Sequence, residues 1–260
     1  MKVKLLNLFL ECITTNSEKM IVGIIQARIG STRLPGKVLL EVNGRTMFEY
    51  LLERVRKCKT IDKIILATSI NKIDDPLESL ALSLGVEVFR GSENDVLERF
   101  YQAATIHKAT HVVRLLNDCP LLDPEIVDEI VSYYLENNEN LDFLSNQNKH
   151  TYPDGMDVSV FSFKALKKLQ ETSGCLIERE HVVPGFWAND NNFIWQNYHN
   201  KIDLFKTYRL TLDYEEDFYL IKEIIKGIYS ENESFNLNDI LFFLNKNSHL
   251  NSINNKYINY

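Results

Sequence analysis

Residues 21–38, IVGIIQARIGSTRLPGKV, join a short apolar run to a basic loop that contains glycine. The apolar run has the length and composition of a buried strand. The loop carries Arg28, Arg33 and Lys37, and residues 20–40 include no acidic side chain. In a chain with a formal net charge of −7, this local excess of positive charge indicates an anionic ligand. The stretch therefore predicts a strand that leads into a phosphate-binding loop.

Small residues in this loop favour the tight turns of phosphate-binding sites. Gly30, Ser31 and Gly36 allow the backbone to turn and to direct N–H groups inward. The loop is not a Walker A motif, because five residues separate the two glycines and Lys37 precedes Val38 instead of serine or threonine. The dinucleotide motif GxGxxG is absent as well. The alternative is a surface turn with solvated cations, and the clustering of three cations without an acid argues against it.

The length of 260 residues allows one large α/β domain, or a main domain with a smaller insertion. The hydrophobic content of 45% is sufficient for a sizeable core. The acidic balance argues against nucleic-acid binding, which leaves a basic footprint. The four cysteines, Cys12, Cys58, Cys119 and Cys175, form no CxxC pair. This spacing favours reduced cytoplasmic thiols over a disulfide framework or a zinc site.

The N-terminal residues 1–12, MKVKLLNLFLEC, have the basic start and short apolar run of a signal peptide, but the resemblance is weak. Asn7 and Glu11 interrupt the apolar run, and no clear cleavage site follows it. We expect a non-secretory extension over residues 1–19, ahead of an alternative start at Met20. Because no apolar run approaches the ~20 residues that span a bilayer, we expect a soluble, cytoplasmic protein with no membrane partner.

Short apolar runs alternate with segments of helical periodicity through the first half of the chain. The expected strands are residues 21–25, 63–69, 86–89, 111–116 and 141–145. The expected helices are residues 46–58, 74–84, 94–107 and 123–135. This alternation predicts an α/β fold, with a parallel sheet between two layers of helices and a ligand at the carboxyl ends of the strands.

Residues 146–205 break the alternation, and we interpret them as an insertion or subdomain that covers the sheet. The elements expected there and beyond are a strand over 157–161, a helix over 163–171, a strand over 208–212 and a helix over 215–228. The main domain then spans residues 20–229. Residues 230–260 are rich in asparagine, and we expect a helix followed by a loose tail of ten residues.

Asp118 and Asp213 each follow an expected strand directly. Two carboxylates at strand ends can together hold a hard cation such as Mg²⁺ beside substrate phosphates. The alternative is that Asp213 is the N-cap of the helix that follows and that Asp118 stabilises a turn. Spacing alone leaves both interpretations open.

Six motifs together resemble one known family. They are QARIGSTRLPGKVL, FRGSENDVLERFYQAA, VVRLLNDCPLLDPEIVD, YPDGMDVSVFS, EREHV and RLTLDYEEDF. In this order they resemble the cytidylyltransferases of the spore-coat polysaccharide F type, relatives of the CMP-Kdo and CMP-sialate synthetases. The resemblance runs from about residue 20 to 228.

The resemblance implies a Rossmann-like nucleotidyltransferase of the glycosyltransferase-A-like class, a three-layer sandwich with an inserted substrate or dimerisation segment. Such an enzyme couples CTP to a small-molecule acceptor with Mg²⁺ and releases pyrophosphate. The family serves surface-polysaccharide or glycoconjugate biosynthesis, and its members are often homodimers. A catalytically inactive nucleotide-binding homologue and an enzyme that uses another nucleoside triphosphate are the alternatives.

The resemblance also implies roles for individual residues. Those implied for CTP binding are Ala27, Arg28, Gly30, Ser31, Arg33 and Lys37. Arg28, Lys37, Asp118 and Asp213 are implied as catalytic, the two aspartates as Mg²⁺ ligands. Asp154, Asp157, Arg179 and His181 are implied for the acceptor pocket.

The chain departs from the family pattern at two positions. Asn117 precedes Asp118 where glycine is common, and Val183 stands where threonine is common. Neither change removes a charge, so the reaction class is unaffected. The acceptor stays open among sugar acids, phosphorylated sugars or polyols, and phosphorylated amino compounds. Nothing in the residues themselves selects cytosine.

Overall fold

The computed structural model describes residues 19–188, 192–230 and 232–258. The expected N-terminal extension, with Cys12, therefore lies outside the described residues except for Lys19. In the described part, no helix is long and apolar enough to cross a membrane.

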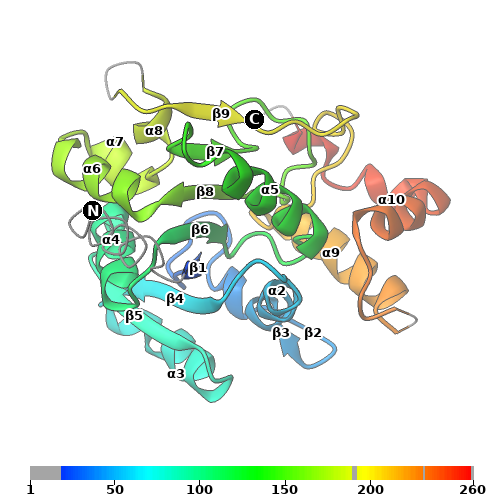
Figure 1. Cartoon of the computed structure of the whole chain (residues 1–260). Helices are drawn as coiled ribbons and strands as arrows, with labels where there is room; N and C mark the ends of the chain where they lie inside the picture. Colours follow the sequence, from blue (N-terminus) through cyan, green and yellow to red (C-terminus); the bar gives the residue numbers. More distant parts are fainter. Residues whose placement is uncertain (1–18, 189–191, 231, 259–260) are drawn as a thin grey trace, which may run out of the picture.

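A seven-stranded sheet forms the centre of the molecule, with the strand order β5-β4-β1-β6-β8-β7-β9 (Figure 1). Its strands are β1 (Ile21–Gln26), β4 (Lys63–Ser69), β5 (Glu87–Gly91), β6 (His111–Leu116), β7 (Phe143–Ser145), β8 (Ser159–Ser162) and β9 (Trp195–Asn197). Neighbouring strands are parallel except where β8 pairs with β6 and β7. A separate hairpin joins β2 (Glu41–Val42) and β3 (Arg45–Thr46). The prediction of a mostly parallel sheet is confirmed.

Helices cover both faces of the sheet, so that β1 is buried between two hydrophobic cores. Alternate side chains of a strand point to opposite faces, and Ile25 packs in one core while Ile24 packs in the other. The first core is covered by α2 (Met47–Arg56), α3 (Asp75–Ser83), α5 (Pro124–Asn137), α9 (Glu215–Ile228) and α10 (Leu237–Lys246). The second is covered by α4 (Val96–Ile106), α6 (Phe163–Thr172) and α8 (Pro184–Trp187). The remaining elements are α7 (Leu176–His181), α11 (Ser248–Asn251) and the 3₁₀ turns η1 (Lys37–Leu39), η2 (Lys72–Asp74) and η3 (Asn255–Tyr257).

Two expectations about the second half of the chain are corrected. Residues 146–205 do more than cover the sheet, because they supply β8 and β9 to it. Residues 208–212 form no strand of the sheet and make one isolated bridge, between Asp154 and Arg209. Their backbone N–H groups bond to loops instead, as when Leu212 donates to the carbonyl of Asp118 over 2.8 Å. The strand-like pattern of residues 208–212 arises because this connecting segment is packed against the rest of the protein, although it does not join the sheet.

The expectation of a loose C-terminal tail is wrong for the residues that are described up to Ile258. After α10 the chain continues through α11 and η3 and packs against α9. Asn254 is only 1% exposed and forms two side-chain hydrogen bonds. The asparagine-rich composition hid this docking because the segment is anchored by single residues and not by an apolar stripe.

Candidate active site

Three segments converge at the carboxyl ends of β1 and β6. Gln26 is in register with Leu116, and the N–H of Asn117 donates to the carbonyl of Gln26 over 3.2 Å. The hydrogen bond from Leu212 to Asp118 then brings the start of α9 to the same place. The predicted convergence of the basic loop with the turn after β6 is therefore confirmed.

The loop after β1 is closed by its own backbone. Gly36 adopts φ 70°, a left-handed conformation that favours glycine, and its N–H donates to the carbonyl of Ile29 over 3.1 Å. The N–H of Ile29 donates to the buried Asp74 carboxylate over 2.7 Å. Gly30 does not adopt a positive φ, so Gly36 is the residue that turns the loop. This closure places Lys37 at the base of the site.

Lys37 lies between the two predicted aspartates. Its Nζ is 2.8 Å from Asp213 Oδ1, 3.3 Å from Asp118 Oδ2 and 2.8 Å from the carbonyl of Leu212. Burial disfavours the ammonium, but the two carboxylates outweigh burial and the pKa of Lys37 is raised. The side chain therefore stays charged at neutral pH.

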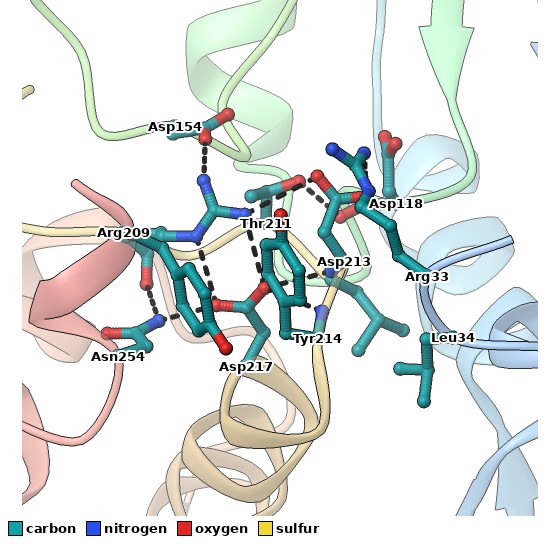
Figure 2. Close-up of polar contacts among 12 residues, drawn as sticks. Arg33, Leu34, Asp118, Asp154, Arg209, Thr211, Asp213, Tyr214, Asp217 and Asn254 are labelled. Carbon is teal, nitrogen blue, oxygen red and sulfur yellow. Dashed lines mark hydrogen bonds and ion pairs between the residues drawn. The ribbon is translucent and has the colours of Figure 1, made fainter. Parts of the chain in front are cut away.

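Asp213 is surrounded by three cations, of which Figure 2 labels Arg33 and Arg209. Besides Lys37, it pairs with Arg33 Nη2 at 2.8 Å and with Arg209 Nη2 at 3.4 Å. Burial alone raises the pKa of a carboxyl group, but these cations outweigh it and the pKa of Asp213 is lowered. Asp213 is not the N-cap of α9, because Tyr214 holds that position. The capping alternative is therefore wrong for this residue.

A cavity of about 500 Å³ opens beside this cluster. It is lined by Gln26, Ala27, Arg28, Ser31, Thr32, Arg33, Lys37, Glu93, Val96, Arg99, Arg114, Leu116, Asn117, Asp118, Glu180 and His181. The predicted site residues that do not line it, although all are described, are Gly30, Asp154, Asp157, Arg179 and Asp213. The cavity thus combines most of the predicted nucleotide-binding residues with one predicted acceptor residue.

Asp154 and Asp157 do not line the cavity, and Asp154 belongs to the charged cluster around Arg209. Asp154 Oδ2 is 2.5 Å from Arg209 Nη1. Burial and repulsion from Asp157 raise the pKa of Asp154, and burial and repulsion from Asp118 raise the pKa of Asp157. Their predicted contact with the acceptor stays a prediction, because neither residue lines the cavity.

The other two predicted acceptor residues lie on α7. Arg179 pairs with Asp95, the N-cap of α4, at 2.7 Å and so holds α7 against α4. His181 ends α7 and lines the cavity. Val182 follows with φ 63° and ψ −61°, and the N–H of Val183 donates to the carbonyl of His181 over 2.7 Å. This is a γ-turn of the strained type, unusual for a β-branched residue, and it fixes the direction of the chain directly after His181.

Two buried arginines that line the cavity, Arg99 and Arg114, were not among the predicted site residues. Burial lowers the pKa of each to about 10, so both stay charged at neutral pH. In each of them the Nε atom has no hydrogen-bond partner among the described residues. A sequence signal for both existed. Burying a charged residue is costly, so an arginine inside the apolar run HVVRLL or the helical segment VLERF indicates a functional or structural role.

The Asp118 and Asp213 carboxylates fit a divalent cation. Both reach a single cationic atom, Lys37 Nζ, which shows that one positive charge can contact the two together. Among the described residues there is no group of three or more His, Cys, Asp or Glu side chains suited to a metal ion. An oxygen-preferring ion such as Mg²⁺ would therefore take its other ligands from phosphate and water, as Mg²⁺ commonly does.

The sequence model described as cytidylyltransferase matches residues 22–247. The chain belongs to the cytidylyltransferase family. As a member of it, the chain is a nucleotidyltransferase.

Known proteins agree with this assignment. A spore coat polysaccharide biosynthesis protein of Bacillus subtilis, SpsF, is 30% identical and covers 87% of this chain and 95% of that protein. A 3-deoxy-manno-octulosonate cytidylyltransferase of Nitratidesulfovibrio vulgaris is 35% identical over 44% of this chain and 46% of its own length. The solved structure of a cytidylyltransferase from Leptospira borgpetersenii is 36% identical, with a TM-score of 0.85, and covers 90% of this chain and 97% of that one. The resemblance to the spore-coat type and to CMP-Kdo synthetases is confirmed.

Proposed function

We propose that this cytidylyltransferase transfers CMP from CTP to an anionic sugar, sugar acid or phosphorylated small molecule, with release of pyrophosphate. The observation that carries the proposal is the position of Lys37 between Asp118 and Asp213, beside a cavity lined by Arg28 and Arg33. Such a set binds a triphosphate together with a divalent cation. The similarity to SpsF favours a product for surface-polysaccharide or glycoconjugate assembly.

The nucleotide side of the proposal rests on charge. Arg28, Arg33 and Lys37 come from one loop, and all three line the cavity. In transfer to the α-phosphorus, negative charge grows on the departing pyrophosphate, and positioned cations stabilise it. Arg33 and Lys37 are held in place by Asp213, so little reorganisation is needed when the triphosphate binds.

Asp118 and Asp213 are the proposed holders of Mg²⁺. When bound, the ion supplies positive charge that offsets the charge of the phosphate oxygens. The low pKa of Asp213 keeps that carboxylate ionised at neutral pH, as a metal ligand must be.

The cavity also carries buried positive charge from outside the basic loop. Arg99 and Arg114 are buried at 2% and 7% exposure and present charge to any group that enters. We infer that they favour an acceptor with a carboxylate or phosphate. An acceptor oxygen that is already anionic attacks the α-phosphorus without a general base, so no base is required of the chain.

The test is a pyrophosphate-release screen with Mg²⁺ and CTP against sugar acids and phosphorylated small molecules. Parallel reactions use UTP, ATP and GTP. The proposal predicts release that needs CTP, Mg²⁺ and one class of anionic acceptor. Tight CTP binding without release across the panel would reject catalysis, and equal release from UTP would reject the choice of CTP.

A further inference from the structure

The C-terminal segment, which we define as residues 248–258, lies beyond the residues 22–247 that the family model matches. We propose that this segment completes the active site, with Asn254 and Tyr257 as positioning residues that hold Asp213 and Arg33. The role of Asp213 and Arg33 in binding CTP and its cation rests on the proposed function. The link from the C-terminal segment to Asp213 and Arg33 rests only on the contacts described below.

Asn254 connects the segment to the base of α9. Its Nδ2 donates to Asp217 Oδ1 over 2.8 Å and to the carbonyl of Arg209 over 3.0 Å (Figure 2). Asn254 is 1% exposed and Asp217 is fully buried. The Oδ1 atom of Asn254 has no partner among the described residues, so the amide serves here as a donor.

Asp217 transmits this contact to the backbone that carries Asp213. Its Oδ2 accepts from the N–H of Asp213 over 2.9 Å and from the N–H of Tyr214 over 3.0 Å. Its Oδ1 accepts from Arg209 Nε over 3.0 Å, and Arg209 reaches Asp213 in turn. A buried carboxylate that loses a hydrogen-bond donor costs free energy, because no water replaces the donor. Loss of the Asn254 amide therefore weakens the set of hydrogen bonds through which Asp217 orients Asp213.

Tyr257 makes a second, independent link. Its ring stacks on Tyr214 with centroids 3.8 Å apart and planes at 5°. The guanidinium of Arg33 lies 5.4 Å from the centroid of the Tyr214 ring and pairs with Asp213. The stack therefore fixes the Tyr214 ring, which supports Arg33, a residue that we propose binds phosphate. Two residues of the segment thus act on the same pair, Arg33 and Asp213.

The experiment compares two alanine variants of neighbouring asparagines in the full chain. Asn254→Ala removes the buried donor, whereas Asn255→Ala removes the same atoms from an exposed side chain and is the matched control. Tyr257→Leu removes the stacked ring, and Tyr257→Phe keeps it. Circular dichroism and thermal melting establish that each variant is folded before the two readouts below are taken.

The first readout is hydrogen exchange of the peptide that spans residues 209–217, without ligand. We expect Asn254→Ala to speed exchange of the Asp213 and Tyr214 amides about tenfold. Both amides donate to Asp217, and this carboxylate is less firmly positioned without the hydrogen bond from Asn254. Strands β1 and β6 and the control should be unchanged. Unchanged exchange at the two amides in a folded Asn254→Ala variant would overturn the inference, whether or not CTP binds.

The second readout is binding of Mn²⁺ in the presence of CTP, followed by the electron spin resonance signal of free Mn²⁺. We expect affinity to fall about tenfold in Asn254→Ala and a few-fold in Tyr257→Leu, with Tyr257→Phe and Asn255→Ala near wild type. Wild-type affinity in both Asn254→Ala and Tyr257→Leu would overturn the inference. If the wild-type protein itself binds no Mn²⁺ with CTP, the proposed function is rejected and the exchange result alone decides the inference.

Discussion

The two sides of the cavity are built differently. On the triphosphate side, Lys37 is 7% exposed and is bonded to Asp118 and Asp213 from two other segments. On the opposite side, α7 is one short helix with no buried residue, and its Leu176 is 83% exposed. One side is thus a network of buried, paired charges, and the other is a short and largely exposed helix that Arg179 joins to α4 and that ends at His181.

This difference separates the reaction from its selectivity. A network in which each charge has several partners loses its geometry when any member changes, so it suits chemistry that does not vary. The exposed positions of such a helix tolerate change because few contacts depend on them. We therefore expect substitutions on the triphosphate side to stop the reaction and substitutions on α7 to alter the choice of acceptor.

The largest expected effect is that of Asp118→Asn. The variant keeps the shape of the side chain but removes one of the two charges on Lys37 and on the proposed cation. Pyrophosphate release should fall by about 10³-fold, as when a key electrostatic contact of a transition state is lost. Thermal melting serves as the control and should shift little. Retention of more than a tenth of the activity would remove the distinction between the two sides.

Gly155→Ala tests the close packing of residues 154–155 against residues 209–210, where Asp154 pairs with Arg209. Gly155 has φ 102°, and an added Cβ would lie 2.5 Å from the backbone carbon of Leu210. The chain around Asp154 would have to leave Arg209, so we expect a loss of about 3 kcal/mol or more in the free energy of unfolding. Gly44→Ala is the matched control, because its φ is 74° and nothing lies within 4 Å. It should cost about 1 kcal/mol, the strain of a left-handed residue alone. Equal losses would show that the close approach is unimportant.

His181→Ala tests the acceptor side. The side chain lines the cavity but forms no part of the Lys37 network. We expect the KM for the acceptor to rise about tenfold, the cost of one lost polar contact, with the KM for CTP unchanged. An increase in the KM for CTP instead would place the nucleotide at α7 and reverse our assignment of the two sides.

The smallest expected effect is that of Leu176→Ser on the exposed face of α7. A surface substitution of this kind changes the free energy of unfolding by about 0.5 kcal/mol or less. Turnover of CTP should stay within twofold of wild type. A loss of stability beyond about 1 kcal/mol, measured by denaturant unfolding, would show that α7 is held more firmly than its contacts indicate.

Much of the triphosphate side was predictable from sequence, since it depends on local rules. A buried strand followed by a basic loop, and a carboxylate directly after the strand HVVRLL, placed Lys37 near Asp118. Asp213 was assigned to the same site by the family resemblance, because the strand expected before it does not form. The parallel part of the sheet followed from the alternation of apolar runs with helical periods.

The parts that escaped prediction depend on contacts between distant segments. Residues 208–212 have the pattern of a strand, but their hydrogen bonds go to loops. The burial of Asn254 has no local signal, because one asparagine in an asparagine-rich tail resembles its neighbours. Arg99 and Arg114 lie in apolar patterns, and only the fold shows that both line one cavity.

The most direct test of the central claim is a crystal structure with CTP and Mn²⁺, using the anomalous signal of manganese. The account predicts an ion bonded to Asp118 and Asp213, with the triphosphate against Arg28, Arg33 and Lys37. An ion bound elsewhere, or a triphosphate that does not contact this loop, would contradict it.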